Sequence, residues 1–520
     1  MKNGLFFNLK MRDRIGLAAV VATCAIFLIL RFDEFPVGAG MDDAYYIEMA
    51  RSLAAGRGPV IHLNDIVPAW RPDIFPVGFP LLLSPLVVLA ATSVQIFKIV
   101  PLLALTTLIP VCLLLTRSAA GRARLALTAL VCLNPWTIGF STRVFSDLPF
   151  AAVSLAAVVL FLDLAEAPRT GRFRFAVLVL VSAAAIMIRS IGLALPAAMV
   201  AYWLMHRRWR QALFLGGGLI AALLPHAVVS RAAGGGLITR GYLNQVFAGD
   251  GTLGSRFALV FENLIGYLHE LPVVMLPVFG NPLENLAGRA GLGTVYGPLQ
   301  LTLGCVLVGA IVWGHVVIGK RDTGRARFLG IYLAVYCGVL LNFSGYPSGV
   351  QPRLLLPILP LLFLVLLEVF DQVAGARRDR LFWPAVLLLL SLSLVHNGYR
   401  AVHPLSSAQD EAGKVFKNPG LGADWIRDNT RGEDLVMVRW PLRQHIHFLR
   451  PVVGFGAVGR KELDERIDRF GVDFIFLGPG QPDEATTSML AILEADPGRF
   501  DPVHQDAGAE VMIFRVAKVP

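Results

Sequence analysis

Long uninterrupted apolar runs are the feature of this chain that most constrains its fold. One covers residues 15–30 (IGLAAVVATCAIFLIL), another covers 381–395 (LFWPAVLLLLSLSLV), and similar runs recur between them. A transmembrane helix needs about 20 mostly apolar residues to cross the hydrocarbon layer. Hydrophobic residues make up 55% of the 520 residues and charged residues only 16%, whereas about 25% of a soluble domain is charged. The sequence therefore predicts an α-helical polytopic membrane protein.

Clusters of basic residues separate these runs and set the predicted topology. Connections rich in Lys and Arg stay on the cytoplasmic side of a membrane, and six such clusters lie at residues 2–14, 117–124, 169–174, 207–210, 320–327 and 377–380. Placing all of them inside predicts about eleven transmembrane helices, with a cytoplasmic N-terminus and an extracytoplasmic C-terminus. The predicted spans are 15–30, 94–115, 125–140, 149–162, 175–188, 191–205, 211–229, 297–318, 328–343, 354–370 and 382–397. The interval 175–205 is short for two full spans, so a tilted or broken arrangement also fits it.

Three longer segments fall on the outer side in this topology. We expect a transmembrane module at 1–397 with outer loops 31–93 and 231–296, followed by an extracytoplasmic tail at 398–520. Helical and strand patterns alternate along the tail, which is typical of a small α/β domain. The expected helices are LGADWIRDNT (421–430) and KELDERIDRF (461–470), and the expected strands are DLVMVRW (434–440), VDFIFLG (472–478) and EVMIFRV (510–516).

Charge and cysteine content argue against two other classes of site. The net charge is +10, but the basic residues sit in short clusters between apolar runs, so membrane lipids and not nucleic acid are expected as partners. All five cysteines lie in or beside apolar runs, which argues against a disulfide framework and against a zinc site.

The first outer loop opens with two adjacent carboxylates. In MDDAYYIEMARSLAAG, Asp42 and Asp43 precede apolar residues at helical spacing, and Gly56 can close the helix. One interpretation is that either aspartate caps this amphipathic helix. Capping needs only one carboxylate, and a helix N-terminus favours the ionised form. The alternative is that one aspartate accepts a proton in catalysis.

A proline-rich stretch follows in the same loop. Pro76, Pro80 and Pro85 interrupt the apolar run 76–91, and proline removes backbone donors from a helix. The sequence therefore predicts a shallow or re-entrant segment here and not a spanning helix.

Several segments, taken in order, resemble one family. The acidic helix DDAYYIEMARSLAAG is followed by FPVGFPLLL, LNPWTIGFSTRVFSDLPFAAVSLA, AAAIMIRSIGLALP and PRLLLPILPLL, and the tail contains ADWIRDNTRGEDLVMVRWP and HFLRPVV. Together they are similar to the GT-C superfamily of integral-membrane glycosyltransferases, especially its protein O-mannosyltransferase and lipid A aminoarabinose transferase-like group. The resemblance covers most of the chain. It implies an inverting transfer of a sugar from a polyprenyl-phosphate donor to an acceptor hydroxyl at the outer face.

The resemblance also implies roles for individual residues. Asp42 matches the catalytic base of the family, and Asp43 lies where relatives often carry a second acid. Asp147 matches the acid of the second outer loop, and Arg189 matches a basic residue that contacts the donor phosphate. A carboxylate suits the first role because a sugar hydroxyl must lose its proton as it attacks.

Two further arginines are candidates for the donor phosphate. Several relatives carry a lysine just before the proline-rich stretch, where this chain has Ile74 and Phe75, and Arg71 is the nearest residue that can replace it. Arg353 precedes the apolar run LLLPILPLL. Arginine suits a leaving phosphate because it is always cationic and binds bidentately. For Arg189 and Arg353 the alternative is an arginine that only reaches to the membrane interface.

Other residues of the outer loops are weaker candidates. Arg143 flanks the second loop, where it contacts substrate or simply pairs with Asp147. Tyr46 and His62 are candidate substrate contacts, although aromatic residues near a membrane often serve only as interfacial anchors. His445 and His447 alternate by two, so on a strand they share one face. A surface pair is the expectation there, and a metal site is the alternative.

The function implied by the resemblance has competitors. One is a transporter or flippase of polyprenyl-linked glycans, which should carry its ionisable residues near the bilayer midplane. Another is a polysaccharide polymerase or ligase. The acceptor can be a glycolipid, a cell-envelope polysaccharide or a protein, and the expected location is a bacterial inner membrane. Two adjacent carboxylates can also hold a divalent cation, so metal dependence stays open.

Overall fold

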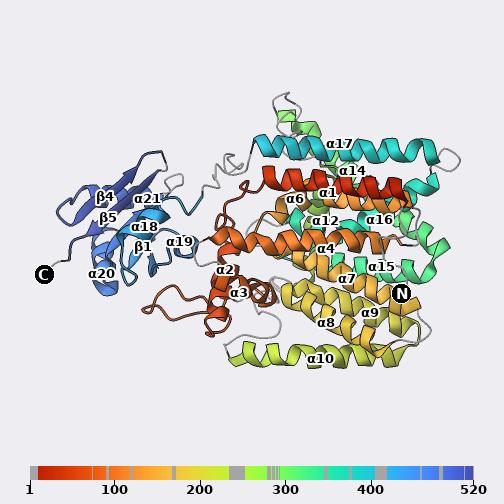
Figure 1. The fold of residues 1–520 in the computed structure, drawn as a ribbon, viewed down its shortest axis with the longest axis horizontal. Helices are drawn as coiled ribbons and strands as arrows, with labels where there is room; N and C mark the ends of the chain where they lie inside the picture. Colours follow the sequence, from red (N-terminus) through yellow and green to blue (C-terminus); the bar gives the residue numbers. More distant parts are fainter. Residues whose placement is uncertain are drawn as a thin grey trace. The chain divides into compact units, whose positions relative to one another are not determined.

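The computed structural model describes residues 10–518 except 73, 90–92, 118–120, 167–170, 233–251, 278–282, 284–286, 289–290, 292, 345–349, 374–377, 404–417, 457–458, 479–483 and 509. Two compact units make up the chain (Figure 1). The first contains Met1–Phe32, Pro76–Phe79 and Ile99–Val402, and the second contains Asp33–Phe75, Pro80–Lys98 and His403–Pro520. Most of the first outer loop therefore groups with the tail. The boundary at 397/398 stays a prediction.

Long apolar helices form the first unit, and Figure 1 shows α1, α4 and α17 with their axes nearly parallel. Its helices are α1 (Met11–Leu30), α4 (Ile99–Leu115), α5 (Gly121–Cys132), α6 (Pro135–Ser141), α7 (Asp147–Glu166), α8 (Arg172–Ile188), η2 (Ser190–Leu193), α9 (Ala194–Met205), α10 (Trp209–Ala232), α12 (Leu253–Met275), α14 (Gly293–Arg321), α15 (Thr323–Leu341), η3 (Pro352–Ile358), α16 (Leu359–Val373) and α17 (Arg378–Val402). Within the described residues, nine helices are long and apolar enough to cross a membrane. The predicted polytopic helical fold is confirmed.

Three of the predicted spans are shorter or bent. The span expected at 125–140 is the pair α5 and α6, which bends by 56° where Asn134 and Pro135 break the helix. The interval 175–205 holds the 17-residue helix α8 and the short pair η2 and α9. It is therefore the broken arrangement that the spacing allowed, and its break falls at Arg189.

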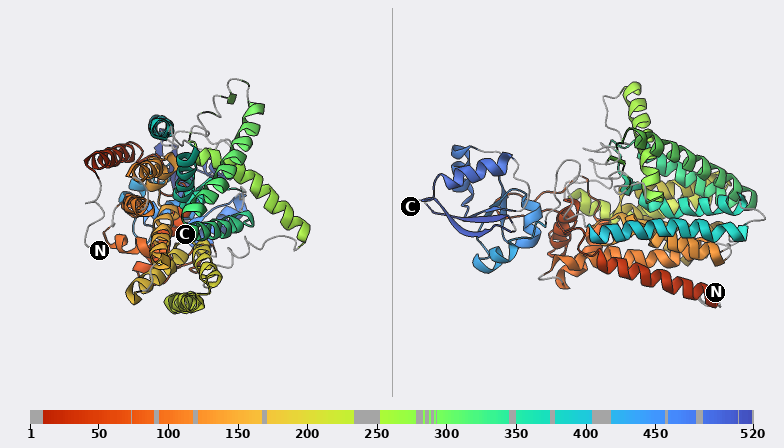
Figure 2. Two further views of the ribbon diagram at one scale, coloured as in Figure 1. Left: turned by 90° about the vertical axis from the view of Figure 1, so that its right-hand side faces the viewer. Right: turned by 90° about the horizontal axis from the view of Figure 1, so that it is seen from above.

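Helix α12 was not predicted, because it falls in the segment 231–296 that we expected to be an outer loop. Its length and composition would allow it to span a membrane. Figure 2 shows this helix, in yellow-green, running across the direction of the long helices of its unit in both views. Its apolar residues are interrupted by Glu262, His269 and Glu270. The sequence therefore shows no continuous apolar run that would predict a span here. Asn263 anchors it by donating to the carbonyls of Leu341 and Phe343, each at 2.9 Å.

A five-stranded sheet forms the core of the second unit, in the order β2-β1-β3-β5-β4. The strands are β1 (Val436–Val438), β2 (Val452–Gly454), β3 (Phe474–Leu477), β4 (Phe500–Asp506) and β5 (Val511–Val516). Strands β2, β1 and β3 are parallel, whereas β5 is antiparallel to both β3 and β4. The helices are α18 (Ala423–Asn429), α19 (Pro441–Phe448), α20 (Arg460–Phe470) and α21 (Glu484–Glu494). The α/β domain expected from the tail is confirmed.

The first outer loop supplies the remaining elements, α2 (Asp42–Ala54), α3 (Gly78–Leu89) and η1 (Val94–Lys98). The 12-residue helix α3 carries the proline-rich stretch, and at 1.5 Å per residue it is about 18 Å long, too short to span. Loop residues also cover the outer edge of the sheet. Val452 of β2 donates to the carbonyl of Leu63 at 3.2 Å, and Asn64 donates to the carbonyl of Val452 at 2.5 Å.

Candidate functional site

Helix α2 begins at an unusual backbone turn. Met41 has φ 61° and ψ −49°, and the N–H of Asp42 donates to the carbonyl of Gly40 at 2.6 Å. This is a γ-turn with positive φ, which is rare and strained for a residue with a side chain. The turn presents Asp42, the first residue of the helix, with its side chain partly exposed. Such strain is often found beside functional groups.

Asp43 has a different environment from its neighbour. Its side chain is buried, and its carboxylate accepts the N–H of Gly38 at 2.5 Å and the N–H of Ala44 at 2.9 Å. Burial raises the pKa of Asp43 to about 7, against the opposing effect of these hydrogen bonds and of Arg443. The idea that either aspartate caps α2 is wrong, because Met41 is the N-cap and its side chain makes no cap. Asp43 instead holds the turn that precedes the helix.

Glu48 is a buried acid on α2 that sequence reasoning missed. Its carboxylate lies 2.8 Å from a guanidinium nitrogen of Arg51 and 3.0 Å from Nδ1 of His445. Burial acts to raise the pKa of Glu48, but its contacts with His445 and Arg51 lower it to about 2. His445 and His447 lie on helix α19, not on a strand, and both are largely buried. The strand on which the two histidines would share one face does not form there.

The other loop candidates lie beside aromatic or exposed groups. Phe75 is buried, with the Tyr45 ring stacked on it at 4.8 Å and the Tyr46 ring edge-on at 5.1 Å. Nε2 of His62 lies 3.2 Å from a carboxylate oxygen of Asp65, whose side chain is 99% exposed. Arg71 is half-buried. Tyr46 thus has a packing role, and its substrate contact stays a prediction, as does that of His62.

In the first unit, Asp147 and Arg189 form a buried ion pair. Asp147 is the first residue of α7, and its carboxylate accepts from Arg189 at 2.8 Å. Arg189 also donates to the hydroxyl of Ser146 at 3.2 Å. The Asp147 side chain is 1% exposed and that of Arg189 is 17% exposed. A pair so poorly solvated holds both side chains in one geometry, with the planar guanidinium fixed beside the start of α7.

Two glycines shape the chain around Arg189. Arg189 is extended (φ −146°, ψ 134°) between α8 and η2, and Gly192 packs so closely that a Cβ there would lie 2.5 Å from the carbonyl oxygen of Ala185. Gly78, from the proline-rich stretch, packs equally closely: a Cβ there would lie 2.4 Å from the carbonyl carbon of Met187. Helix α8 therefore ends sharply, and the turn carries Arg189.

Two further arginines lie at the connection between α6 and α7, Arg143 within it and Arg353 against it from η3. The guanidinium carbon of Arg353 lies 5.5 Å from the centre of the Phe145 ring, and that of Arg143 lies 4.9 Å from the centre of the Phe140 ring. We call Arg143, Arg189 and Arg353 the arginine cluster. Arg189 and Arg353 thus contact the segment 140–147 that contains Arg143. Cation–π contacts orient Arg143 and Arg353.

Arg31, at the end of α1, is a fourth arginine near this cluster that sequence reasoning missed. It is buried and donates to the carbonyl of Pro135 at 3.2 Å and to the side-chain oxygen of Asn397. A Cβ at Gly139 would lie 2.9 Å from a terminal nitrogen of Arg31 and 3.9 Å from one of Arg143. Glycine at 139 therefore lets two guanidinium groups approach the same helix turn. In the sequence Arg31 resembled an ordinary charge flanking a span.

The described residues contain no group of three His, Cys, Asp or Glu side chains placed to hold a metal ion. Asp42, Asp43, Tyr46, His62 and Arg71 belong to the second unit, and the arginine cluster and Asp147 belong to the first. The structure brings Asp147 and Arg189 together, and it adds Glu48 and Arg31 to the predicted residues.

No protein-family model and no curated protein matches the chain, but solved structures match over nearly all of it. ArnT from Cupriavidus metallidurans bound to undecaprenyl phosphate is 14% identical, with a TM-score of 0.56, covering 96% of this chain and 97% of ArnT. The apo state of that ArnT is 15% identical, with a TM-score of 0.57, and the match covers 96% of this chain and 98% of ArnT. AglB from Archaeoglobus fulgidus, an archaeal oligosaccharyltransferase in complex with an inhibitory peptide and a dolichol-phosphate, is 13% identical, with a TM-score of 0.54, covering 93% and 71%.

Both of these proteins are GT-C glycosyltransferases. At such low identity the similarity establishes the fold, and it agrees with the resemblance that the order of sequence segments carried. The chain therefore has the GT-C fold of the integral-membrane glycosyltransferases.

Proposed function

We propose that this protein is an inverting glycosyltransferase that moves a sugar from a polyprenyl-phosphate donor to an acceptor hydroxyl. The arginine cluster on the α6–α7 connection is the observation that carries this proposal. Aromatic rings orient Arg143 and Arg353, and the buried carboxylate of Asp147 orients Arg189. Three guanidinium groups suit a phosphate that gains negative charge as it leaves. The structural neighbours support it, since one holds undecaprenyl phosphate and the other holds a dolichol-phosphate.

The proposed step breaks one bond and forms one. The acceptor oxygen attacks the anomeric carbon from the face opposite the phosphate, and the bond between this carbon and the phosphate oxygen breaks. The bonding electrons leave with the polyprenyl phosphate, whose charge Arg189 stabilises. Asp42 takes the proton of the acceptor hydroxyl, because it is the partly exposed member of the aspartate pair and a positioned carboxylate can act as general base.

Asp147 has a supporting role in this proposal. Its carboxylate lies 2.8 Å from a guanidinium nitrogen of Arg189 and fixes the orientation of that side chain. We place the protein in a bacterial inner membrane, with the N-terminus in the cytoplasm and the C-terminal domain outside. The acceptor is a glycolipid, a cell-envelope polysaccharide or a protein.

Binding of undecaprenyl phosphate to the purified full-length protein in nanodiscs tests the donor part of the proposal. We expect Arg189→Gln to weaken this binding by about 10- to 100-fold, the range for losing a hydrogen bond to a charged group. The matched control is Arg321→Gln, because Arg321 also pairs with a carboxylate at 2.8 Å, that of Glu368. Equal affinity of both variants for the lipid would contradict the assignment.

A further inference from the structure

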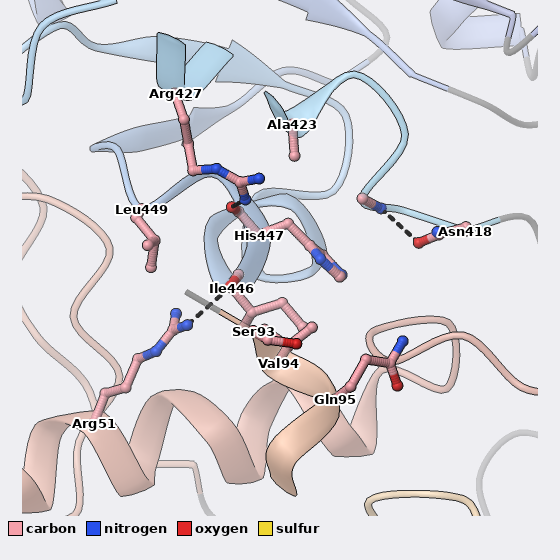
Figure 3. A pocket seen from close by; sticks show the side chains of 11 residues that line it. Arg51, Ser93, Val94, Gln95, Asn418, Ala423, Arg427, Ile446, His447 and Leu449 are labelled. Carbon is pink, nitrogen blue, oxygen red and sulfur yellow. Dashed lines mark hydrogen bonds between the residues drawn. The ribbon is translucent and has the colours of Figure 1, made fainter. Parts of the chain in front are cut away.

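A polar pocket of about 180 Å³ lies within the second unit, away from the residues used above. Figure 3 shows Arg51 of α2 and Arg427 of α18 reaching from opposite sides toward the end of α19, and Gln95 of η1 and Asn418 also line the pocket. At ~30 Å³ per water molecule the pocket holds about six waters. This volume is therefore enough for about one sugar ring.

The Lys, Arg, Asp and Glu side chains that line the pocket are two arginines, Arg51 and Arg427. One nitrogen of Arg51 donates to Glu48 at 2.8 Å and another donates to the carbonyl of Ile446 at 2.9 Å. Arg427 donates to the carbonyl of His447 at 2.8 Å and pairs with Asp424, whose side chain is 86% exposed. An exposed ion pair contributes little, so it leaves the charge of Arg427 largely uncompensated.

The histidine in the wall of the pocket is neutral. Nε2 of His447 lies 2.9 Å from the carbonyl oxygen of Val37, so this nitrogen carries the proton and donates. Burial lowers the pKa of His447 to about 4, and Arg51 and Arg427 add to this effect. The two guanidinium groups are therefore the cations that a ligand meets, and each has N–H groups beyond those already bonded.

One wall atom points to hydroxyl groups on the ligand. The side-chain oxygen of Gln95 is buried and accepts no hydrogen bond from any residue that the structure describes. A buried acceptor without a donor is costly, and a sugar hydroxyl is a donor of suitable size. Two guanidinium groups and an unused amide oxygen thus match a ring that carries both an anionic group and hydroxyl groups.

We propose that this pocket binds an anionic monosaccharide unit, a sugar phosphate or a sugar acid, of the acceptor glycan. Arg51 and Arg427 bind the phosphate or carboxylate, and Gln95 accepts from a ring hydroxyl. The assignment to the acceptor rests on the proposed function, whereas binding of an anionic sugar does not. The pocket would then select an acceptor that carries negative charge at a unit other than the one that reacts.

The test uses the full-length protein and three soluble probes, glucose 1-phosphate, glucuronate and glucose, in saturation-transfer NMR titrations. We expect at least one anionic sugar to bind and glucose to bind at least about tenfold more weakly. The stronger of the two anionic probes identifies the phosphate or the carboxylate as the anion. Equal binding of glucose, or no binding of either anionic sugar, would overturn the proposal.

Two variants locate the binding. Arg427→Gln should weaken the anionic probe by about tenfold or more, and Gln95→Ala should weaken it without removing charge. Arg466→Gln is the matched control, because Arg466 lies on helix α20 of the same unit and pairs with Glu462 at 2.8 Å. Loss of binding in the control, or full binding in both pocket variants, would place the probe elsewhere.

The same titration separates this proposal from the proposed function. Asp42→Asn should keep full affinity for the anionic sugar, since Asp42 does not line the pocket. If wild type binds the sugar but transfers nothing from a polyprenyl-phosphate donor, the proposed function fails and the pocket stands. If transfer proceeds but no anionic sugar binds, the pocket fails alone.

Discussion

The carboxylate of Glu48 lies 3.0 Å from Nδ1 of His445, and this contact joins helix α2 to helix α19 within the second unit. The contact brings an imidazole nitrogen against a carboxylate but lacks the direction of a good hydrogen bond. Glu48 is only 3% exposed, so little water screens the pair. Because Asp42 begins the same helix, α19 fixes the element that carries the proposed base.

We expect His445→Ala to lower the rate of sugar transfer by about 10- to 100-fold, since a displacement of about 1 Å can have that effect. Affinity for undecaprenyl phosphate should stay at the wild-type value. His445→Gln retains a donor for Glu48 and should recover part of the rate. The control is His504→Ala on β4. A rate for His445→Ala equal to that of the control would remove His445 from any positioning role.

The raised pKa of Asp43 predicts how stability changes with pH. Burial raises this pKa to about 7, from an ordinary value of 3.8. Between these values the folded protein holds a proton that the unfolded chain has lost, so the contribution to stability falls as pH rises toward 7. We expect the Tm of wild type to fall from pH 5 to pH 8. Asp43→Asn keeps an acceptor oxygen but cannot ionise, so its Tm should change less.

Glu48 should make stability rise with pH, the opposite of Asp43, and over a more acidic pH range. Its pKa is about 2, below the ordinary 4.5, because of His445 and Arg51. Its contribution to stability is therefore complete above about pH 4.5 and is lost as pH falls toward 2. Glu48→Gln should flatten the acid side of the Tm profile only. Equal acid sensitivity of wild type and Glu48→Gln would contradict the ion pair's part in stability.

The long helices and three strands could be predicted because each carries a dense apolar pattern. Residues 436–438, 474–477 and 511–516 are almost entirely apolar, and all three segments are strands. Strand β2 is only three residues long, and β4 reads FDPVHQD. Neither has the alternation that identifies a strand. Helix α19 was not predicted, although Pro441 can begin a helix, because its eight residues lie between the segments with a clear helical or strand pattern.

The candidate site was predicted residue by residue but not as contacts. Asp147 and Arg189 were both expected, yet their pairing joins positions 42 residues apart and depends on how α7 and α8 pack. Glu48 was missed because one acid on the polar side of an amphipathic helix is unremarkable in a sequence. Glu48 becomes buried only because α19 packs over it, and this contact between distant segments cannot be predicted from the residues around Glu48.

Asp42→Asn should abolish sugar transfer while leaving expression and undecaprenyl-phosphate affinity unchanged. Asparagine has nearly the same shape but cannot take the proton of the attacking hydroxyl, and losing general-base catalysis costs about 10²- to 10⁴-fold in rate. The matched control is Asp65→Asn, since Asp65 is an exposed acid of the same loop. Near wild-type turnover of Asp42→Asn with a defined lipid-linked donor would refute its role as base.

Gly192→Ala tests whether the turn at Arg189 sets donor affinity. A Cβ at residue 192 would lie 2.5 Å from the carbonyl oxygen of Ala185, so the backbone between α8 and η2 must move and carry Arg189 away from Asp147. We expect affinity for undecaprenyl phosphate to fall by about tenfold or more, the effect of losing one charged contact. Gly216→Ala in α10 is the control, because nothing lies within 4 Å of a Cβ there and alanine favours a helix by about 0.5–1 kcal/mol. If both variants bind the lipid equally well, the position of Arg189 does not determine donor binding.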